Sequence, residues 1–158
     1  MDINKYLKFA LDLHNAGEIS KAGALCDIVL AERPNHTEAN HLSGLVSLAN
    51  GNILDAITKI QKAIDGDSEQ AIFYNSLGNA HNIEGNNHKA ARAYRTAITI
   101  NPDLHEAHHN LAKVLEKDDD IASAKLHLVK ATDLVPESYE SNYSLARILL
   151  KLESFDEA

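Results

Sequence analysis

Apolar residues recur along this chain at spacings of three and four, the period of a helix that buries one face. In a representative stretch, one such run includes Leu77 and Ala80, and the next includes Tyr94 and Ala97. A polar turn around Gly85 separates the two runs, and glycine there can adopt a positive φ without a Cβ clash. The pattern predicts a helix, a tight turn and a second helix.

This helix–turn–helix pattern repeats every 34 residues. Asp119 takes the place of the turn glycine in the fourth repeat, and aspartate tolerates the left-handed conformation well enough to keep the turn. We expect the repeated alanines to face small residues of the preceding helices, Gly44, Gly78, Ala112 and Ala146. The equivalent positions are Ala22, Ala56, Ala90, Ala124 and Ala158; Gly17, Gly51 and Gly85; and Pro34, Pro102 and Pro136.

A fixed period of this length is typical of like units stacked in a line, each burying its apolar face against its neighbours. The predicted fold class is therefore all-α, an α-solenoid of helical hairpins that spans residues 1–158 as a single array. The predicted units are about 3–36, 37–70, 71–104, 105–138 and a partial 139–158.

The motif Asn75-Ser76-Leu77-Gly78-Asn79-Ala80, followed by Gly85, Ala90, Tyr94, Ala97 and Pro102, resembles the tetratricopeptide repeat (TPR) family. The resemblance covers essentially the whole chain. It implies a right-handed superhelix in which the first helix of each unit lines a concave groove and the second helix forms the convex wall. The large aromatic that the family carries early in the first helix is replaced here by Asn40, His108 and Asn142.

The composition narrows the class of protein. The net charge of −8 leaves no basic stripe to neutralise phosphates, so we expect no nucleic-acid partner. The apolar stretches are short and periodic, and Met1-Asp2-Ile3-Asn4-Lys5 does not begin a secretory leader, so we expect a cytoplasmic protein that does not bind membranes. The single cysteine, Cys26, lies on an apolar helix face and is interpreted as a small core residue.

The chain ends at Ala158, in what the repeat predicts to be the opening turn of another second helix. A solenoid normally closes with a polar-faced cap. We therefore expect a fragment of a longer chain whose last first helix, with Leu145, Ile148 and Leu149, is only partly covered and can self-associate.

If first helices line a groove, their residues that are not needed for packing are candidate ligand contacts, and their chemistry changes along the chain. The early residues are apolar, the middle ones are amides that can pair with a peptide backbone, and the late ones are mixed and charged. The leucines have an equally good interpretation as packing residues, and the late charges as a solvated surface. The candidates are Leu7, Leu11, His41 and Leu45; Asn75, Asn79, Asn82 and Asn110; and His109, Lys113, Tyr143 and Arg147.

Family functions can be compared with these positions. Chaperone-binding members hold a C-terminal carboxylate with a cationic pair, but here those places carry Glu140 and Ser144, so a carboxylate clamp is disfavoured. The run of asparagines is instead similar to the superhelix of O-linked glycosyltransferases, where groove asparagines hold the substrate backbone. Similar arrays also precede bacterial sulfotransferase domains.

Catalytic and metal-binding motifs are not evident. His105, His108 and His109 can offer two ligands from one helix face, short of the four that structural zinc needs, so we expect no metal and no cofactor. No phosphate-binding loop, nucleophile elbow or His-Glu-x-x-His occurs, so any catalysis would lie beyond residue 158. If His41, His81 and His109 contact a ligand, we expect its affinity to change between about pH 7.5 and 5.5.

The sequence therefore predicts a scaffold for protein–protein interaction that binds a peptide or partner protein in its groove. The alternative is the substrate-recruiting N-terminal segment of a larger glycosyl- or sulfotransferase. A dimerisation scaffold is a third possibility.

Overall fold

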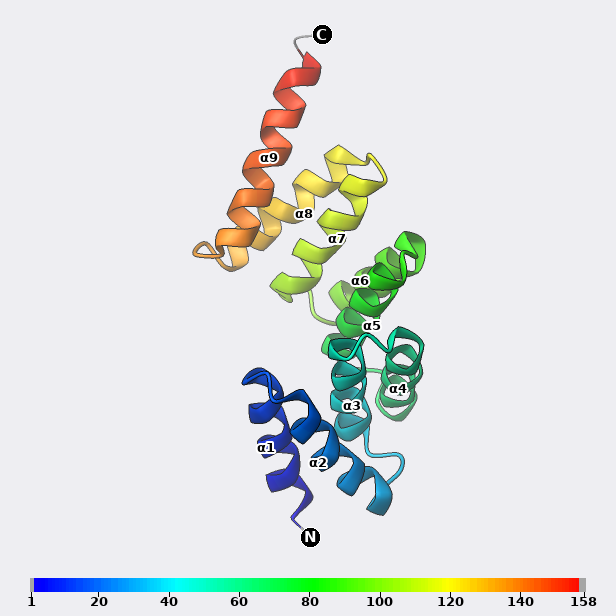
Figure 1. Cartoon of the computed structure of the whole chain (residues 1–158). Coiled ribbons are helices and arrows are strands. Elements are labelled where there is room, and N and C mark those ends of the chain that lie inside the picture. The colour runs from blue at the N-terminus through cyan, green and yellow to red at the C-terminus, as the bar shows by residue number, and fades with distance from the viewer. Residues whose placement is uncertain (1, 157–158) are drawn as a thin grey trace.

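The computed structural model describes residues 2–156, and every regular element in them is an α-helix (Figure 1). Side-chain oxygens of Asp2, Asn86 and Asp120 accept hydrogen bonds from backbone N–H groups and so cap α1, α6 and α8. The helices are α1 (Ile3–Asn15), α2 (Ile19–Glu32), α3 (Thr37–Ala49), α4 (Ile53–Gly66), α5 (Ala71–Glu84), α6 (Asn87–Ile100), α7 (His105–Lys117), α8 (Ile121–Leu134) and α9 (Tyr139–Asp156).

Each helix packs mainly on the helices before and after it in the chain. In addition, α1 contacts α3, α3 contacts α5 and α5 contacts α7, whereas α2, α4, α6 and α8 make no comparable contacts with one another in the described part of the chain. A stack whose members approach more closely on one side curves toward that side. The first helices therefore form the inner wall of an α-solenoid, and the second helices form the outer wall. The hand of the superhelix stays a prediction.

The tight turns inside the first four hairpins share one geometry. Gly17, Gly51 and Gly85 have φ between 77° and 85°, and Asp119 has φ 61°. In each turn the next residue donates its N–H to a carbonyl five residues earlier, as from Asp120 to Leu115 at 2.9 Å. The expectation that Asp119 preserves the glycine turn is thus confirmed.

The crossing of the two helices within each hairpin matches a small residue to a larger one. A Cβ on Gly44 would lie within 2.6 Å of Ile60, and a Cβ on Gly78 would overlap the ring of Tyr94. Where the facing residue is smaller or more flexible, the first helix carries alanine. The two alanine pairs are Ala10 with Cys26, and Ala112 with Leu128. Cys26 is fully buried, as predicted, and burial raises the pKa of its thiol to about 11.

The polar residues that replace the aromatic early in the first helix share one structural role, which the sequence analysis did not identify. Asn40 donates to the carbonyl of Pro34 at 3.0 Å, His108 Nε2 contacts that of Pro102 at 3.0 Å, and Asn142 donates to that of Pro136 at 2.7 Å. Each pair is six residues apart, and each bond ties the loop between units to the next first helix. The unit that retains Tyr74 has Ser68 in place of proline.

The C-terminal unit departs from the prediction. The repeat places a turn at Glu153, but α9 continues through it to Asp156, so no second helix begins in the described residues. Ile148 is fully buried against α7 and α8, contrary to the expectation that it is only partly covered. Leu149 and Leu150 are exposed. The expected position of Ala158 lies outside the described residues.

Candidate functional site: the inner wall

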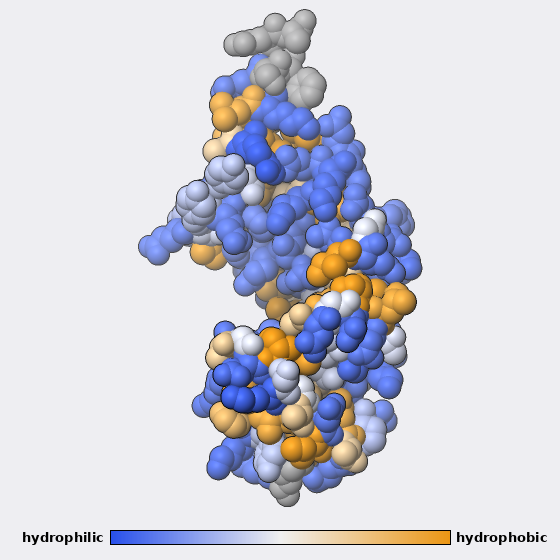
Figure 2. Space-filling model, viewed as in Figure 1, coloured by the Kyte–Doolittle hydropathy of each residue, from blue (hydrophilic) through white to orange (hydrophobic). Residues whose placement is uncertain are grey.

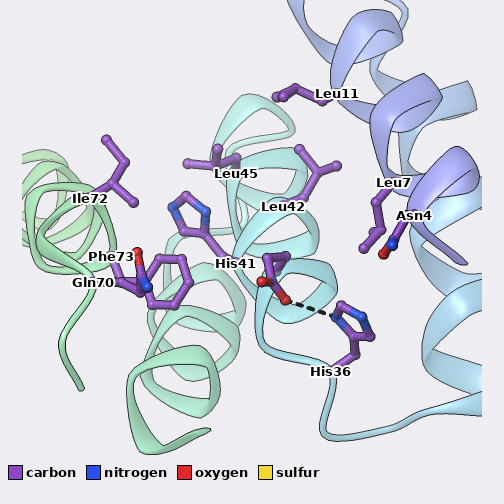
Figure 3. A pocket seen from close by; sticks show the side chains of 11 residues that line it. Asn4, Leu7, Leu11, His36, His41, Leu42, Leu45, Gln70, Ile72 and Phe73 are labelled. Carbon is purple, nitrogen blue, oxygen red and sulfur yellow. Dashed lines mark ion pairs between the residues drawn. The ribbon is translucent and has the colours of Figure 1, made fainter. Parts of the chain in front are cut away.

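A cavity of about 670 Å³ opens on the inner wall where α1, α3 and α5 meet (Figure 3). Four of the predicted groove residues, Leu7, Leu11, His41 and Leu45, line it together. Leu11 is 46% exposed although it is apolar, so it is not consumed by packing. The remaining lining residues are Asn4, His36, Glu38, Leu42, Gln70, Ile72 and Phe73.

Sequence reasoning missed the contribution of α5 to this cavity. Figure 3 shows Ile72 and Phe73 on α5 facing Leu45 and His41 of α3, with Leu7 and Leu11 of α1 on the other side. Phe73 is buried, whereas Ile72 is 43% exposed. Adjacent apolar residues on a helix cannot both point into one core, and this was a signal that one of them reaches the surface.

His41 is built into the cavity wall. Its ring packs on Phe73 with centroids 4.6 Å apart, and Nε2 lies 2.8 Å from the hydroxyl of Ser76. Burial, reinforced by the nearby His14, lowers the pKa of His41 from 6.5 to about 4. The imidazole is therefore neutral at physiological pH. The expectation that His41 titrates between pH 7.5 and 5.5 is wrong, because its charged form is poorly solvated here.

The middle of the inner wall is an amide network. Asn110 Nδ2 donates to Asn75 Oδ1 at 3.2 Å and to Asn79 Oδ1 at 3.1 Å, and the hydroxyl of Tyr94 also donates to Asn79 Oδ1 at 2.7 Å. Asn75 was expected on the open surface of the groove, but it is only 5% exposed and lies between helices. Asn82 accepts from Lys117 Nζ at 2.8 Å.

The histidines of α7 are also used internally. His109 is buried, contrary to its predicted place in the groove, and its Nδ1 lies 3.1 Å from the hydroxyl of Ser141 on α9. His105 approaches the same hydroxyl at 2.9 Å, and His108 contacts His127 at 3.0 Å. Burial is the main cause that lowers the pKa of His109, so its charged form is disfavoured too. Among residues 2–156 no group of three or more potential ligands is placed to hold a metal ion.

The late part of the inner wall is charged, and its charges are paired with each other. Arg147 of α9 forms an ion pair with Glu116 of α7, and Lys151 contacts Asp119 at 3.0 Å. Arg147 and Lys151 line a shallow hollow of about 390 Å³. Lys113 also lines it and is exposed. Tyr143 is 58% exposed and stacks on Tyr139 with ring centroids 6.2 Å apart.

The face shown in Figure 2 reflects this division. Apolar side chains reach the surface over the lower part of the molecule, whereas the upper part, formed by α7 to α9, is mostly hydrophilic.

Comparison with known proteins supports this architecture. The sequence profile described as TPR repeat matches residues 78–119. These residues run from the middle of α5 through α6 and α7 to the turn at Asp119. These residues match the tetratricopeptide repeat. No curated protein sequence matches it.

Solved structures share the fold of this α-solenoid. The structure titled MamA protein is 22% identical, with a TM-score of 0.80 over 98% of this chain and 85% of that one. PilF of Pseudomonas aeruginosa is 20% identical, with a TM-score of 0.89 over 97% of this chain and 70% of that one. An O-GlcNAc transferase mutant of Thermobaculum terrenum is 26% identical, with a TM-score of 0.79 over 83% of this chain and only 26% of that one.

Within the α-solenoid, the twelve predicted groove residues fall into two groups. One group lines the α1–α3–α5 cavity or stands exposed on α7 and α9. The other group, Asn75, Asn79, Asn82, His109 and Asn110, is engaged in hydrogen bonds between neighbouring units. No helix in the described residues has the length and apolar character needed to cross a membrane.

Proposed function

We propose that this TPR array is a protein-interaction scaffold that holds a segment of a partner protein along its inner wall. An apolar side chain of the partner is seated in the α1–α3–α5 cavity. The observation that supports this most directly is the preformed apolar cavity itself, whose exposed walls include Leu11 and Ile72. Ligand sites are typically concave, apolar and largely preformed, with a few polar groups that fix orientation.

A solved structure with the same fold supports the binding of a peptide. The protein YrrB, 20% identical with a TM-score of 0.72, is titled a TPR protein with an unusual peptide-binding site. TPR arrays are generally non-catalytic, and a stack of helical hairpins presents extended surfaces rather than a reaction centre. The role proposed here is binding without chemistry in the described residues.

The amide network supplies the polar part of the proposed site. Asn79 Oδ1 accepts two internal hydrogen bonds, which leaves its Nδ2 to donate, and Asn110 uses its Nδ2 internally, which leaves its Oδ1 to accept. One donor and one acceptor on neighbouring first helices match the carbonyl and N–H of a peptide backbone. We infer that these two atoms hold the partner segment after its apolar anchor.

The cavity is tested with peptides selected on the purified protein from a random peptide library. Their affinities are then measured by fluorescence anisotropy for wild type, Leu11→Asp and Ile72→Asp. Both residues are already exposed, so the variants should fold, and we expect each to weaken binding by about tenfold or more. Leu126→Asp is the matched control, because Leu126 is 69% exposed on the outer helix α8. Equal affinity for all four proteins would contradict the proposal.

The amides are tested separately from the cavity with the same peptides. Asn110→Ala removes the proposed backbone acceptor together with the internal bonds. Tyr94→Phe removes only an internal bond, at a cost in the free energy of unfolding of about 1 kcal/mol. We expect Asn110→Ala to weaken peptide binding and Tyr94→Phe to leave it unchanged. If both variants weaken binding equally, the amides act only through the packing of α5 and α7.

A second candidate is the substrate-recruiting segment of a larger transferase. It is favoured by the 26% identity to the Thermobaculum terrenum O-GlcNAc transferase together with the inner-wall asparagines, although this chain spans only about a quarter of that protein. The reading frame downstream of residue 158 tests it. A following domain with a nucleotide-sugar site would support this candidate, and a downstream sequence without such a domain would count against it.

Self-association through the C-terminal unit remains a further proposal, supported by the exposed Leu149 and Leu150 on α9. Light scattering across a concentration series tests it. A mass that stays monomeric at every concentration would contradict it.

A further inference from the structure

A second groove lies on the outer wall, away from the cavity described above. It measures about 390 Å³ and runs between α4 and α6, which do not contact each other closely, over a floor provided by α5. The floor is apolar, with Ile64 of α4 and the half-buried Tyr74 and Leu77 of α5. The rim on the α6 side carries Lys89 and Arg92.

Three cations lie in a row along α6. Lys89, Arg92 and Arg95 are exposed, and no carboxylate lies within ion-pairing distance of them among the described residues. Some cations elsewhere are ion-paired, such as Lys59 with Asp55 at 2.7 Å and Arg147 with Glu116. A second shallow hollow of about 360 Å³, formed by α6 alone, also includes Arg92 and Arg95. The positive surface therefore extends from the groove along the helix.

This arrangement costs the isolated protein stability. The three cations follow one another at a spacing of three, where like charges on a helix repel, and α6 contains no acidic residue to offset them. Lys89 also lies in the first turn, where the helix dipole is positive and a cation is unfavourable. The net charge of −8 led us to expect no basic stripe, and α6 corrects that expectation with a short row of cations.

The carboxylates around the groove form no ion pair with Lys89, Arg92 or Arg95 among the described residues. Glu84 pairs with His81 at 2.9 Å, and Asp65 accepts from Gln61 at 2.9 Å. Asp118 accepts from Asn87 at 3.0 Å, and Asp120 caps α8 through Ser123 at 3.1 Å while lying near Arg95. Each has another hydrogen-bond partner, and the side chains of Lys89, Arg92 and Arg95 stay exposed.

We propose that the groove between α4 and α6 docks an acidic segment of a partner protein. The carboxylates of that segment meet Lys89, Arg92 and Arg95, and an apolar side chain rests on the Tyr74–Leu77 floor. Charge complementarity supports an anionic occupant, and the apolar floor favours a peptide over a nucleic acid. Three cations in an acidic protein are also too few for the phosphate contacts that nucleic-acid binding needs. This surface is separate from the inner wall, so the proposal stands apart from the function proposed above.

The probe is a fluorescein-labelled peptide of repeated Glu-Glu-Leu units, measured by anisotropy against the full chain at low ionic strength. The test variant carries Lys89→Gln, Arg92→Gln and Arg95→Gln. We expect it to bind at least about tenfold more weakly, because charge-assisted hydrogen bonds are lost. Its own melting temperature should be equal to or above that of wild type, since the repulsion within α6 is gone.

A matched variant controls for net charge. It carries Lys8→Gln, Lys62→Gln and Lys125→Gln, three exposed lysines on other helices. We expect this variant to retain the wild-type affinity. Equal weakening in both triple variants would overturn the proposal, because general attraction to the whole protein would then explain binding. A peptide with serine in place of leucine tests the floor, and it should bind to wild type more weakly than the leucine peptide does.

Other occupants give distinct results. If light scattering shows that wild type dimerises and the α6 variant does not, the groove holds a second copy of this chain and the proposal is wrong. If a labelled single-stranded DNA binds more tightly than the peptide and loses affinity in the α6 variant alone, the occupant is a nucleic acid and the proposal is equally wrong.

Discussion

The two ends of the inner wall are made from the same kind of helical hairpin but differ in what they leave exposed. One end leaves apolar side chains exposed, and the polar groups of the other end bond to one another. Around α1, α3 and α5, apolar side chains such as Leu11 and Ile72 remain exposed beside a cavity. Around α7 and α9, the polar groups bond to one another, as Arg147 does to Glu116 and His109 to Ser141. The difference teaches that position on the concave side does not by itself make a residue available to a ligand. Availability depends on whether the neighbouring unit already satisfies it.

The strongest test of this contrast is Phe73→Ala. Phe73 is 4% exposed and supports both the cavity wall and the core between α4 and α5. Its removal leaves a void, and we expect the free energy of unfolding to fall by about 3–5 kcal/mol. Urea denaturation followed by circular dichroism measures this. A loss below about 1 kcal/mol would mean that the apolar half does not depend on this contact.

The second test concerns α5, where the two halves meet. A methyl group at Gly78 would overlap the Tyr94 ring, so Gly78→Ala should reduce the free energy of unfolding by about 1–3 kcal/mol. Adding Tyr94→Leu recreates the Ala112–Leu128 pair of the next unit. The double variant should then be more stable than the sum of the two single changes predicts. Simple additivity in thermal or urea unfolding would refute this account of the crossing.

Acidification provides a third test. Folded His41 takes up its proton near pH 4, whereas an unfolded imidazole does so near 6.5, so the unfolded state binds more protons between these values. The free energy of unfolding should therefore fall as the pH drops through this window, and His41 should contribute about 1–2 kcal/mol of that fall. We expect His41→Gln to lessen the difference in stability between pH 7 and pH 4.5. His88→Gln, at an exposed position on α6, is the matched control for the loss of an imidazole.

The smallest effect is expected at the charged end. Arg147→Gln breaks the ion pair with Glu116, but the arginine side chain is 50% exposed. Exposed pairs contribute only about 0–1 kcal/mol, so urea denaturation should show little change. A loss comparable to that of Phe73→Ala would erase the contrast between the two halves.

Much of the fold could be predicted from the sequence because the repeat depends on interactions within a single hairpin. Glycine or aspartate at the turns, small residues at the crossings and apolar spacing all act within one hairpin. The site was harder to predict. Leu7, Leu11, His41 and Leu45 were identified by their positions on first helices, and they do lie together.

The errors arose where a residue depends on the next unit. Asn75 and His109 were assigned to the open groove, but their partners, Asn110 and Ser141, lie more than thirty residues away and bury them. The pKa of His41 likewise depends on burial among three helices, which spacing does not report. The end of α9 differs because the predicted turn there has Glu153, without the glycine or aspartate that the other turns use.

Contacts between alternate helices join α1, α3, α5 and α7 but not the outer helices of the described residues. Successive hairpins are therefore joined more closely along the inner edge of the array than along its outer edge. Small rotations between hairpins can change its pitch without opening the core inside any hairpin. The width of the groove along the inner wall can thus adjust to ligands of different thickness. The spacing between the second helices on the outer wall then changes in the opposite sense.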